Sequence, residues 1–316
     1  DSSWYTLFIP EPQMSFTDFG SQTAMWHDIL VALLKGYVEK VYNNAKSRWM
    51  SRNVETAYLD SSHPNFEEEY RVLIHKELFK NEDEAGFCKA INKLKQELTA
   101  GTFSKSIRIA NSNDFEALCI AGHLYQPLLY LNESSFKHKE IGNLIEVRPV
   151  ALNKGERDFV CDIQRFFDNN PAFFEGKSLY LLRNKSRKGI GFFDDSGFYP
   201  DFIVWLVVGE HQYVSFIDPK GITYLNGFAS SKIQLYKFIR EDIEPGLHDA
   251  SITLNSYIIS NTEMKDVKHW VDFPELDLSS KQKKFNEHHV YFQGDQRDSY
   301  IRLILENMIS SSETNV

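Results

Sequence analysis

The chain has 316 residues, of which 42% are hydrophobic and 14% aromatic, and its 35 Lys and Arg against 44 Asp and Glu give a formal net charge of −9 at pH 7. This composition excludes disorder as the main state and suffices for two compact domains, or for one large domain with an appendage. The acidic balance disfavours an indiscriminate nucleic-acid coat but leaves room for a local basic groove. No apolar run approaches the roughly 18–20 residues of a membrane helix, so we expect no membrane partner.

The three cysteines, Cys88, Cys119 and Cys161, are far apart in the sequence and form no CxxC pair. Neither a disulfide framework nor a zinc site is therefore predicted, and a reducing compartment fits best. The chain starts at Asp1 without a basic-then-apolar signal segment. We expect a cytoplasmic protein, and the start suggests a piece of a longer polypeptide.

The first third of the chain is predicted to be mainly helical. Apolar residues from Trp26 to Tyr42 recur at spacings of three and four, which predicts a long amphipathic helix. Two further helical patterns lie around residues 67–79 and 84–98. Short apolar runs such as LLYL and LIEVRPV then predict strands up to Val150. The change of pattern there divides the chain into a helical and mixed connector region, residues 1–148, and a second domain, residues 149–316.

The second domain is predicted to be α/β. A helix follows Asn153, and the spacing of Asn153 and Glu156 is typical of a capping box. KSLYLLR, FYPDFIVWLVV and YVSFIDPKG predict three strands, SSKIQLYKFIRED a helix, and ITLNSYIIS a fourth strand. A last strand, HHVYFQG, precedes a helix from about Gln296 to Met308. The order helix, three strands, helix, strand predicts a mixed sheet flanked by helices.

The predicted hairpin gathers charged residues at one end. Asp201 begins one strand, and Asp218 and Lys220 end the next. A turn centred on Gly209–Glu210 would place Asp201 opposite Asp218, whereas a turn centred on Glu210–His211 would place it opposite Lys220. In either register the Cβ atoms lie within about 8 Å. Asp218 and Lys220 are two residues apart, so they share one face of the strand.

Two buried carboxylates side by side are costly unless a cation joins them. A hard divalent ion such as Mg²⁺ binds carboxylate and carbonyl oxygens, and it promotes attack of water on a phosphoryl group. The pattern therefore predicts metal-dependent hydrolysis of a phosphodiester, with an ordinary salt bridge to Lys220 as the simpler alternative. Glu156 lies on the apolar face of its helix, where either the metal site or the capping box would be its partner.

At these residues the sequence resembles a known family. YPDFIVWLVVGEHQYVSFIDPKG resembles the PD-(D/E)xK nuclease motif, with Pro200 and Asp201 as its first half and Asp218, Pro219 and Lys220 as its second. The order of elements over residues 153–260 is similar to the restriction-endonuclease-like core. Residues 149–308 resemble the C-terminal nuclease region of type III restriction subunits and related DEAD/DEAH helicase–nuclease defence proteins. The segments VRPVALNKGERDFVCDIQRFF and VYFQGDQRDSYIRLIL carry this resemblance. The preceding region looks like the connector to such a helicase.

The resemblance implies a Mg²⁺-dependent endonuclease that cleaves DNA, with Mn²⁺ as a substitute and a helicase or ATPase module in the same longer chain or complex as partner. Asp201 and Asp218 would bind the metal with the Pro219 carbonyl, Lys220 would position the attacking water, and Glu156 would be the helix-borne acid. Because Pro219 has no N–H, its strand should be an edge strand or bulged there. A catalytically silent nucleic-acid-binding or assembly module on the same fold, or a repair or junction nuclease, are the alternatives.

Two weaker signals complete the sequence. One is a group of five cations without an intervening acid: Lys177, Arg183, Lys185, Arg187 and Lys188. These cations could hold a phosphate backbone, or they could form a solvated turn. The adjacent His288 and His289 would point to opposite faces of a strand, so we interpret them as surface residues rather than metal ligands.

Overall fold

The computed structural model describes residues 18–54, 59, 62–66, 69–75, 82–100, 107–108, 115–118, 128–186, 188–192, 199–223, 225, 227–267, 277–297 and 299–311. The chain divides into two units, residues 1–55 and residues 56–316. The expected change of region at residue 149 falls inside the second unit, so that boundary stays a prediction.

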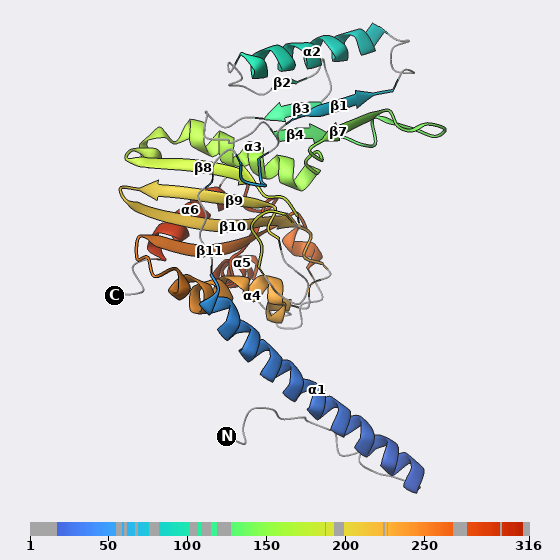
Figure 1. Ribbon diagram of the computed structural model, residues 1–316, viewed down its shortest axis with the longest axis vertical. Helices are drawn as coiled ribbons and strands as arrows, with labels where there is room; N and C mark the ends of the chain where they lie inside the picture. Colours follow the sequence, from blue (N-terminus) through green and yellow to red (C-terminus); the bar gives the residue numbers. More distant parts are fainter. Residues whose placement is uncertain are drawn as a thin grey trace. The chain divides into compact units, whose positions relative to one another are not determined.

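The first unit contains the predicted long helix, α1 (Phe19–Arg52), which is confirmed (Figure 1). Asp18 caps its start, because the Asp18 carboxylate accepts hydrogen bonds from the Ser21 backbone N–H at 2.9 Å and from the Ser21 hydroxyl at 2.6 Å. At 34 residues α1 is about 51 Å long.

The second unit is built on a mixed sheet of five strands among the described residues (Figure 1). In spatial order they are β12 (Val290–Phe292), β11 (Ile252–Ser260), β10 (His211–Lys220), β9 (Phe202–Val208) and β8 (Lys177–Arg183). β8, β9 and β10 pair antiparallel, whereas β10, β11 and β12 pair parallel. The predicted α/β class with a mixed sheet is confirmed.

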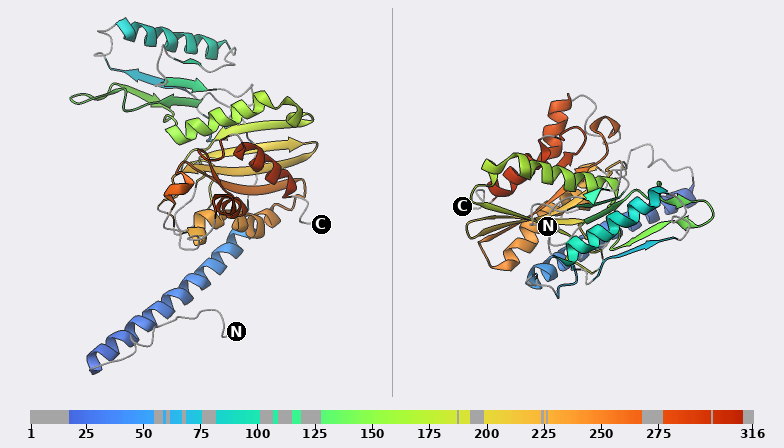
Figure 2. Two further views of the ribbon diagram at one scale, coloured as in Figure 1. Left: turned by 180° about the vertical axis from the view of Figure 1, so that it is seen from behind. Right: turned by 90° about the horizontal axis from the view of Figure 1, so that it is seen from above.

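Helices cover both faces of this sheet. α3 (Lys154–Asn169) and α6 (Tyr300–Ser310) share a core with Tyr257 and Ile259 of β11. α4 (Ser231–Phe238) and α5 (Leu278–Glu287) share another with Ile258. Figure 2 shows α3 and α6 together on one side of the sheet. Because successive side chains of a strand point to opposite faces, the apolar run of β11 can serve both cores.

A smaller β region precedes α3. It contains a three-stranded antiparallel sheet, the pair β1–β7 and a short hairpin, and α2 (Glu82–Thr99) shares a core with β1, β3, β4 and β7. The strands are β1 (Arg71–Ile74), β2 (Ile107–Arg108), β3 (Phe115–Leu118), β4 (Leu128–Leu131), β5 (Lys137–His138), β6 (Gly142–Asn143) and β7 (Ile145–Arg148). The strands predicted from LLYL and LIEVRPV and the helix predicted around residues 84–98 are confirmed.

The helix predicted around residues 67–79 is wrong where the structure describes it. Residues 71–74 form β1, which pairs antiparallel with β7 from Arg71 opposite Arg148 to Ile74 opposite Ile145. Val72 and Ile74 are half-buried while Arg71 and Leu73 are exposed, a period of two. The local pattern of apolar residues is compatible with a helix or a strand, and pairing with β7, some 70 residues later, selects the strand.

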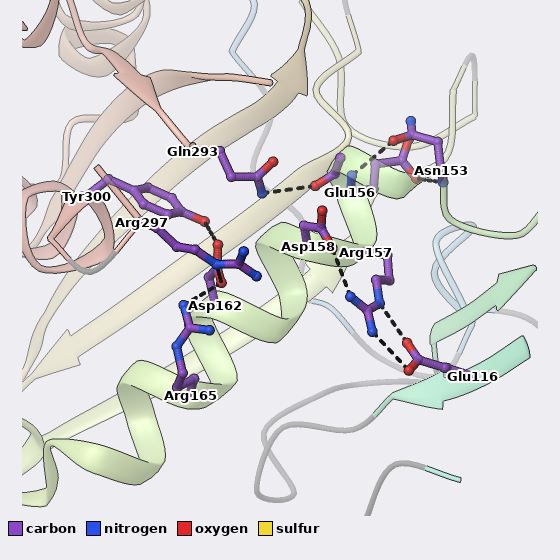
Figure 3. A network of polar contacts seen from close by, with 11 residues as sticks. Glu116, Asn153, Glu156, Arg157, Asp158, Asp162, Arg165, Gln293, Arg297 and Tyr300 are labelled. Atoms are coloured by element: carbon purple, nitrogen blue, oxygen red, sulfur yellow. Dashed lines mark hydrogen bonds and ion pairs between the residues drawn. The ribbon is translucent and has the colours of Figure 1, made fainter. Parts of the chain in front are cut away.

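A buried ion pair joins the smaller β region to α3. Glu116 of β3 is fully buried, and its two carboxylate oxygens accept hydrogen bonds from Nε and Nη2 of Arg157 at 2.7 and 2.9 Å (Figure 3). The pairing with Glu116 raises the pKa of Arg157 against the opposing effect of burial. The Arg157 guanidinium also lies over the Tyr130 ring, 5.7 Å from its centroid.

We expect Arg157→Met to lower the free energy of unfolding by about 3–5 kcal/mol, because it leaves the Glu116 carboxylate buried without a counter-charge. Denaturant unfolding at neutral pH measures this loss. The double variant Glu116→Gln/Arg157→Met is the matched control and should be the more stable of the two, since it removes both charges. A double variant less stable than Arg157→Met would contradict the uncompensated-charge explanation.

The prediction that His288 and His289 are surface residues is wrong for His289. Its ring stacks between those of Tyr236 and Tyr257, with centroids 4.0 and 4.9 Å away. Its Nδ1 lies 3.1 Å from the carbonyl oxygen of Ser256, to which it donates. Burial lowers the pKa of His289 to about 4, assisted by the nearby charges of Arg240 and His288.

This burial predicts an acid-sensitive fold. Because the unfolded chain binds a proton at a pKa near 6.5 and the folded chain only near 4, His289 should remove about 2 kcal/mol of stability as the pH falls from 6.5 to 4. The native chain should be more stable than His289→Asn near pH 7, and this difference in the free energy of unfolding should shrink or reverse as the pH falls to 4. His138→Asn, at an exposed position, is the control and should show a constant difference.

Candidate functional site

The register of the central hairpin places two aspartates opposite each other. β9 pairs with β10 from His211 opposite Val208 to Ile217 opposite Phe202. One step further, the same register puts Asp201 opposite Asp218. This is the register of a turn centred on Gly209–Glu210, the first of the two that the sequence left open.

The two carboxyl groups interact in a poorly hydrated place. Asp218 is 8% exposed and Asp201 partly buried. Burial, the charge of Asp218, a hydrogen bond with Asp218 and the charge of Glu156 raise the pKa of Asp201 to about 8. This shift favours the protonated form of the Asp201 carboxyl near neutral pH. This is the electrostatic cost that two adjacent carboxylates were expected to bear.

Lys220 completes this cluster. Its ammonium forms an ion pair with Oδ2 of Asp218, and the two side chains are only 19% and 11% exposed. Burial lowers the pKa of Lys220, while Asp218 opposes that shift. The structure thus brings Asp201, Asp218 and Lys220 together, as their spacing predicted.

Pro219 is accommodated by a different arrangement from the expected one. β10 lies between β9 and β11, so it is not an edge strand. Its ladder with β9 ends at Ile217, and continuing the register puts Pro219 opposite Pro200. Because neither proline has an N–H to donate, this position suits both residues without a bulge.

Glu156 forms the predicted capping box at the start of α3. The Glu156 backbone N–H donates to Oδ1 of Asn153 at 3.0 Å, and the Asn153 backbone N–H donates to Oε2 of Glu156 at 3.1 Å (Figure 3). Oε1 accepts from the Asn153 amide at 2.7 Å, and Oε2 also accepts from Nη2 of Arg183 at 3.1 Å. Glu156 thus has local partners and still lies near enough to affect Asp201.

The cations before the hairpin have partners within the protein. Arg183 donates to Glu156 and to the carbonyl oxygens of Val150 and Ala151. Nζ of Lys185 donates to the carbonyl oxygen of Phe66 at 3.1 Å, and Nζ of Lys177 to that of Phe173 at 2.8 Å. Lys188 is exposed, and Arg187 lies outside the described residues. Arg183 and Lys185 thus have structural contacts where DNA contacts were expected.

Sequence reasoning missed Asn184, which holds the start of β9. Its buried amide donates to the carbonyl oxygens of Pro200 and Ile190 at 2.9 and 2.6 Å. Oδ1 accepts from the Ile190 N–H at 2.9 Å and from the amide of Asn65 at 3.1 Å. The Asn184 backbone N–H donates to the Asp201 carbonyl oxygen at 2.8 Å. Its partner Asn65 is 119 residues away, so no local pattern could reveal the contact.

The donor set fits a hard divalent cation in its chemistry. Asp201, Asp218 and the Pro219 carbonyl are all oxygen donors, as Mg²⁺ and Mn²⁺ prefer. A cation between the carboxylates would remove the repulsion by Asp218 that, after burial, raises the Asp201 pKa. As the described side chains stand, however, no three His, Cys, Asp or Glu residues form a group that could hold a metal ion.

Comparisons of this chain with protein-family models, curated proteins and solved structures find no match. The nuclease resemblance therefore remains a prediction from the residues themselves. In the part of the chain that the structure describes, no helix combines the length and apolarity needed to cross a bilayer.

The hydrogen bonds around Asn184, here called the Asn184 clamp, can be tested by a substitution at Gly189. A Cβ at this position would collide with the amide oxygens of Asn184 and Asn65. We therefore expect Gly189→Ala to lower the free energy of unfolding by about 1–3 kcal/mol through overpacking. Gly294→Ala is the matched control, because the nearest atom to its Cβ would be Cγ of Glu263 at 3.9 Å. Equal melting temperatures for the two variants would show that the clamp contributes little.

Proposed function

We propose that the chain is the nuclease part of a larger helicase–nuclease and that it hydrolyses DNA phosphodiester bonds with a divalent metal. The observation that carries the proposal is the placement of Asp201 opposite Asp218, with Lys220 paired to Asp218, at the end of a buried hairpin. Carboxylates held this close are costly in a purely structural role. A divalent cation at this place would bind the two carboxylates, and a phosphate group would pair with Lys220.

The order of elements supports a restriction-endonuclease-like core as the finer fold. α3 is followed by the antiparallel strands β8, β9 and β10, then by α4 and by β11, which pairs parallel with β10. This is the order that the resemblance implied. The candidate site lies where β9 begins and β10 ends, beside the start of α3.

Asp201 and Asp218, with the Pro219 carbonyl, would hold Mg²⁺ or Mn²⁺. When bound, such an ion polarises a phosphoryl oxygen and makes a water molecule more acidic. Asp201 would have to be deprotonated, and Lys220 would exchange part of its pairing with Asp218 for a contact to water or phosphate. Glu156 would contribute negative charge next to Asp201 while it caps α3.

Substrate and partner follow from the same proposal. Lys188 is the exposed described cation of the run that was predicted to bind DNA, so we assign a backbone-phosphate contact to it. A helicase or ATPase module in the same longer chain or complex would deliver the DNA. Cys88 and Cys161 are not part of a disulfide, which agrees with a reducing, cytoplasmic location for such a defence nuclease.

One observation favours a second candidate, a catalytically silent nucleic-acid-binding or assembly module. The ion pairs Lys220–Asp218 and Glu156–Arg183 satisfy most of the charge at the site without a metal. In such a module the acids would only stabilise the hairpin and α3.

Plasmid cleavage with Mg²⁺ or Mn²⁺ separates the two candidates. We expect Asp218→Asn and Lys220→Met each to lower the cleavage rate by roughly 100-fold or more, because each removes a group that acts on the reacting phosphate. Asp168→Asn, at an exposed position of α3, is the matched control and should cleave like the native chain.

Thermal melting with and without the metal provides a second readout. The nuclease predicts a metal-dependent rise in melting temperature for the native chain and for Asp168→Asn, and none for Asp218→Asn. A native chain that neither cleaves nor gains stability with either metal would support the silent module. Cleavage that persists in Asp218→Asn and Lys220→Met would contradict the assigned site.

A further inference from the structure

Of the described side chains of α1, ten large hydrophobic ones are exposed, by 36% to 82%. They are Phe19, Trp26, Leu30, Leu33, Leu34, Tyr37, Val38, Val41, Tyr42 and Trp49. At about 100° per residue they all fall on one half of the helix circumference, centred between Tyr37 and Val38. The same half also contains His27, Arg48 and Arg52 toward its two ends, whereas the opposite half contains Asp28, Lys35, Ala32 and the buried Ile29. Large apolar side chains therefore predominate on one half of α1, which is uninterrupted by polar residues between Leu30 and Tyr42.

The size of this apolar face matches a protein–protein interface. With about 150–250 Å² for each large side chain, the exposed fractions add up to roughly 1,000 Å². A specific interface buries about 1,200–2,000 Å² over both partners. Two such faces in contact reach this range, and a contiguous exposed patch above a few hundred Å² marks an interaction site.

The order of the apolar residues along α1 is symmetric about its middle. Trp26 and Trp49 are equally far from the point between Tyr37 and Val38, as are Leu33 and Tyr42 and also Leu34 and Val41, since the residue numbers of each pair add up to 75. Two antiparallel helices related by a two-fold axis at this point place the members of each pair at the same level. A two-fold interface requires such self-complementarity.

Charge selects the antiparallel direction over the parallel one. Residues 18–35 contain two Asp and one Lys, whereas residues 36–52 contain one Glu and four Lys or Arg. An antiparallel pair brings the acidic half of one helix alongside the basic half of the other. It also sets opposite ends of the two helix dipoles together, while a parallel pair would align the basic halves.

We propose that α1 is a dimerisation helix, through which two copies of the chain pair antiparallel by the apolar face centred on Tyr37 and Val38. Leu34 of one copy lies opposite Val41 of the other near the middle of the seam, and the aromatic residues at both ends flank it. The dimer needs neither the metal nor DNA, and it stands independently of the proposed nuclease activity.

Sedimentation analysis of the whole chain over a range of concentrations tests the dimer. We expect a reversible dimer in the native chain and a dissociation constant raised by about 100-fold or more in Leu34→Glu, because each copy then buries a carboxylate in the seam. Ala32→Glu puts the same charge on the opposite half of α1 and should change the constant by less than about threefold. A native chain that stays monomeric, or a dimer that Leu34→Glu leaves intact, would overturn the proposal.

Cysteine cross-linking tests the direction of pairing and does not depend on Leu34. In a chain whose three native cysteines are replaced by Ser, Thr23→Cys and Arg52→Cys occupy one level of the antiparallel pair. A mixture of the two variants should form the disulfide under mild oxidation. Each variant alone should not, since its two thiols would lie about 43 Å apart along the helices. Cross-linking of Thr23→Cys with itself would establish a parallel pair and overturn the antiparallel one.

Discussion

The antiparallel register of β9 and β10 is the constraint on which the candidate site depends. It brings the carboxyl groups of Asp201 and Asp218 together where little water reaches them, and the pKa of Asp201 rises in response. The tight turn at Gly209, with φ of +60°, sets this register rather than the one shifted by two residues, which would place Asp201 opposite Lys220. The electrostatic strain at Asp201 is thus a consequence of the hairpin register.

The surroundings of the hairpin hold this arrangement in place. Asn184 secures the Pro200 carbonyl and the backbone of Asp201, and Arg183 reaches across to the cap of α3 at Glu156. Arg183, which was predicted to bind DNA, therefore supports the acid Glu156. Farther along α3, the buried Glu116–Arg157 pair fastens the smaller β region to the same helix. Elements that are distant in the sequence thereby converge on α3, which carries both the capping acid and the main core.

The two units differ in how far their large apolar side chains are buried. In the second unit, Phe159, Phe202 and Tyr300 are completely covered by the sheet and its helices. In α1 ten large hydrophobic side chains are exposed on one half of the helix, and helices in water are stabilised mainly by packing of such a face. The proposed antiparallel pair would supply for α1 the burial that the sheet supplies for α3 and α6, by contact between chains.

The sequence by itself determined the α/β class, the strands from β8 to β11, the capping box of Asn153 and Glu156, and the joint placement of Asp201, Asp218 and Lys220. These follow from local periodicity and from short spacings along a strand, where geometry leaves few choices. Only the tertiary structure decided the hairpin register, the burial of His289 between two tyrosines, the strand at residues 71–74 and the roles of Asn184, Arg183 and Lys185. The hairpin register depends on the geometry of its short turn, and the others depend on partners farther away along the chain, whose burial and pairing leave no local pattern.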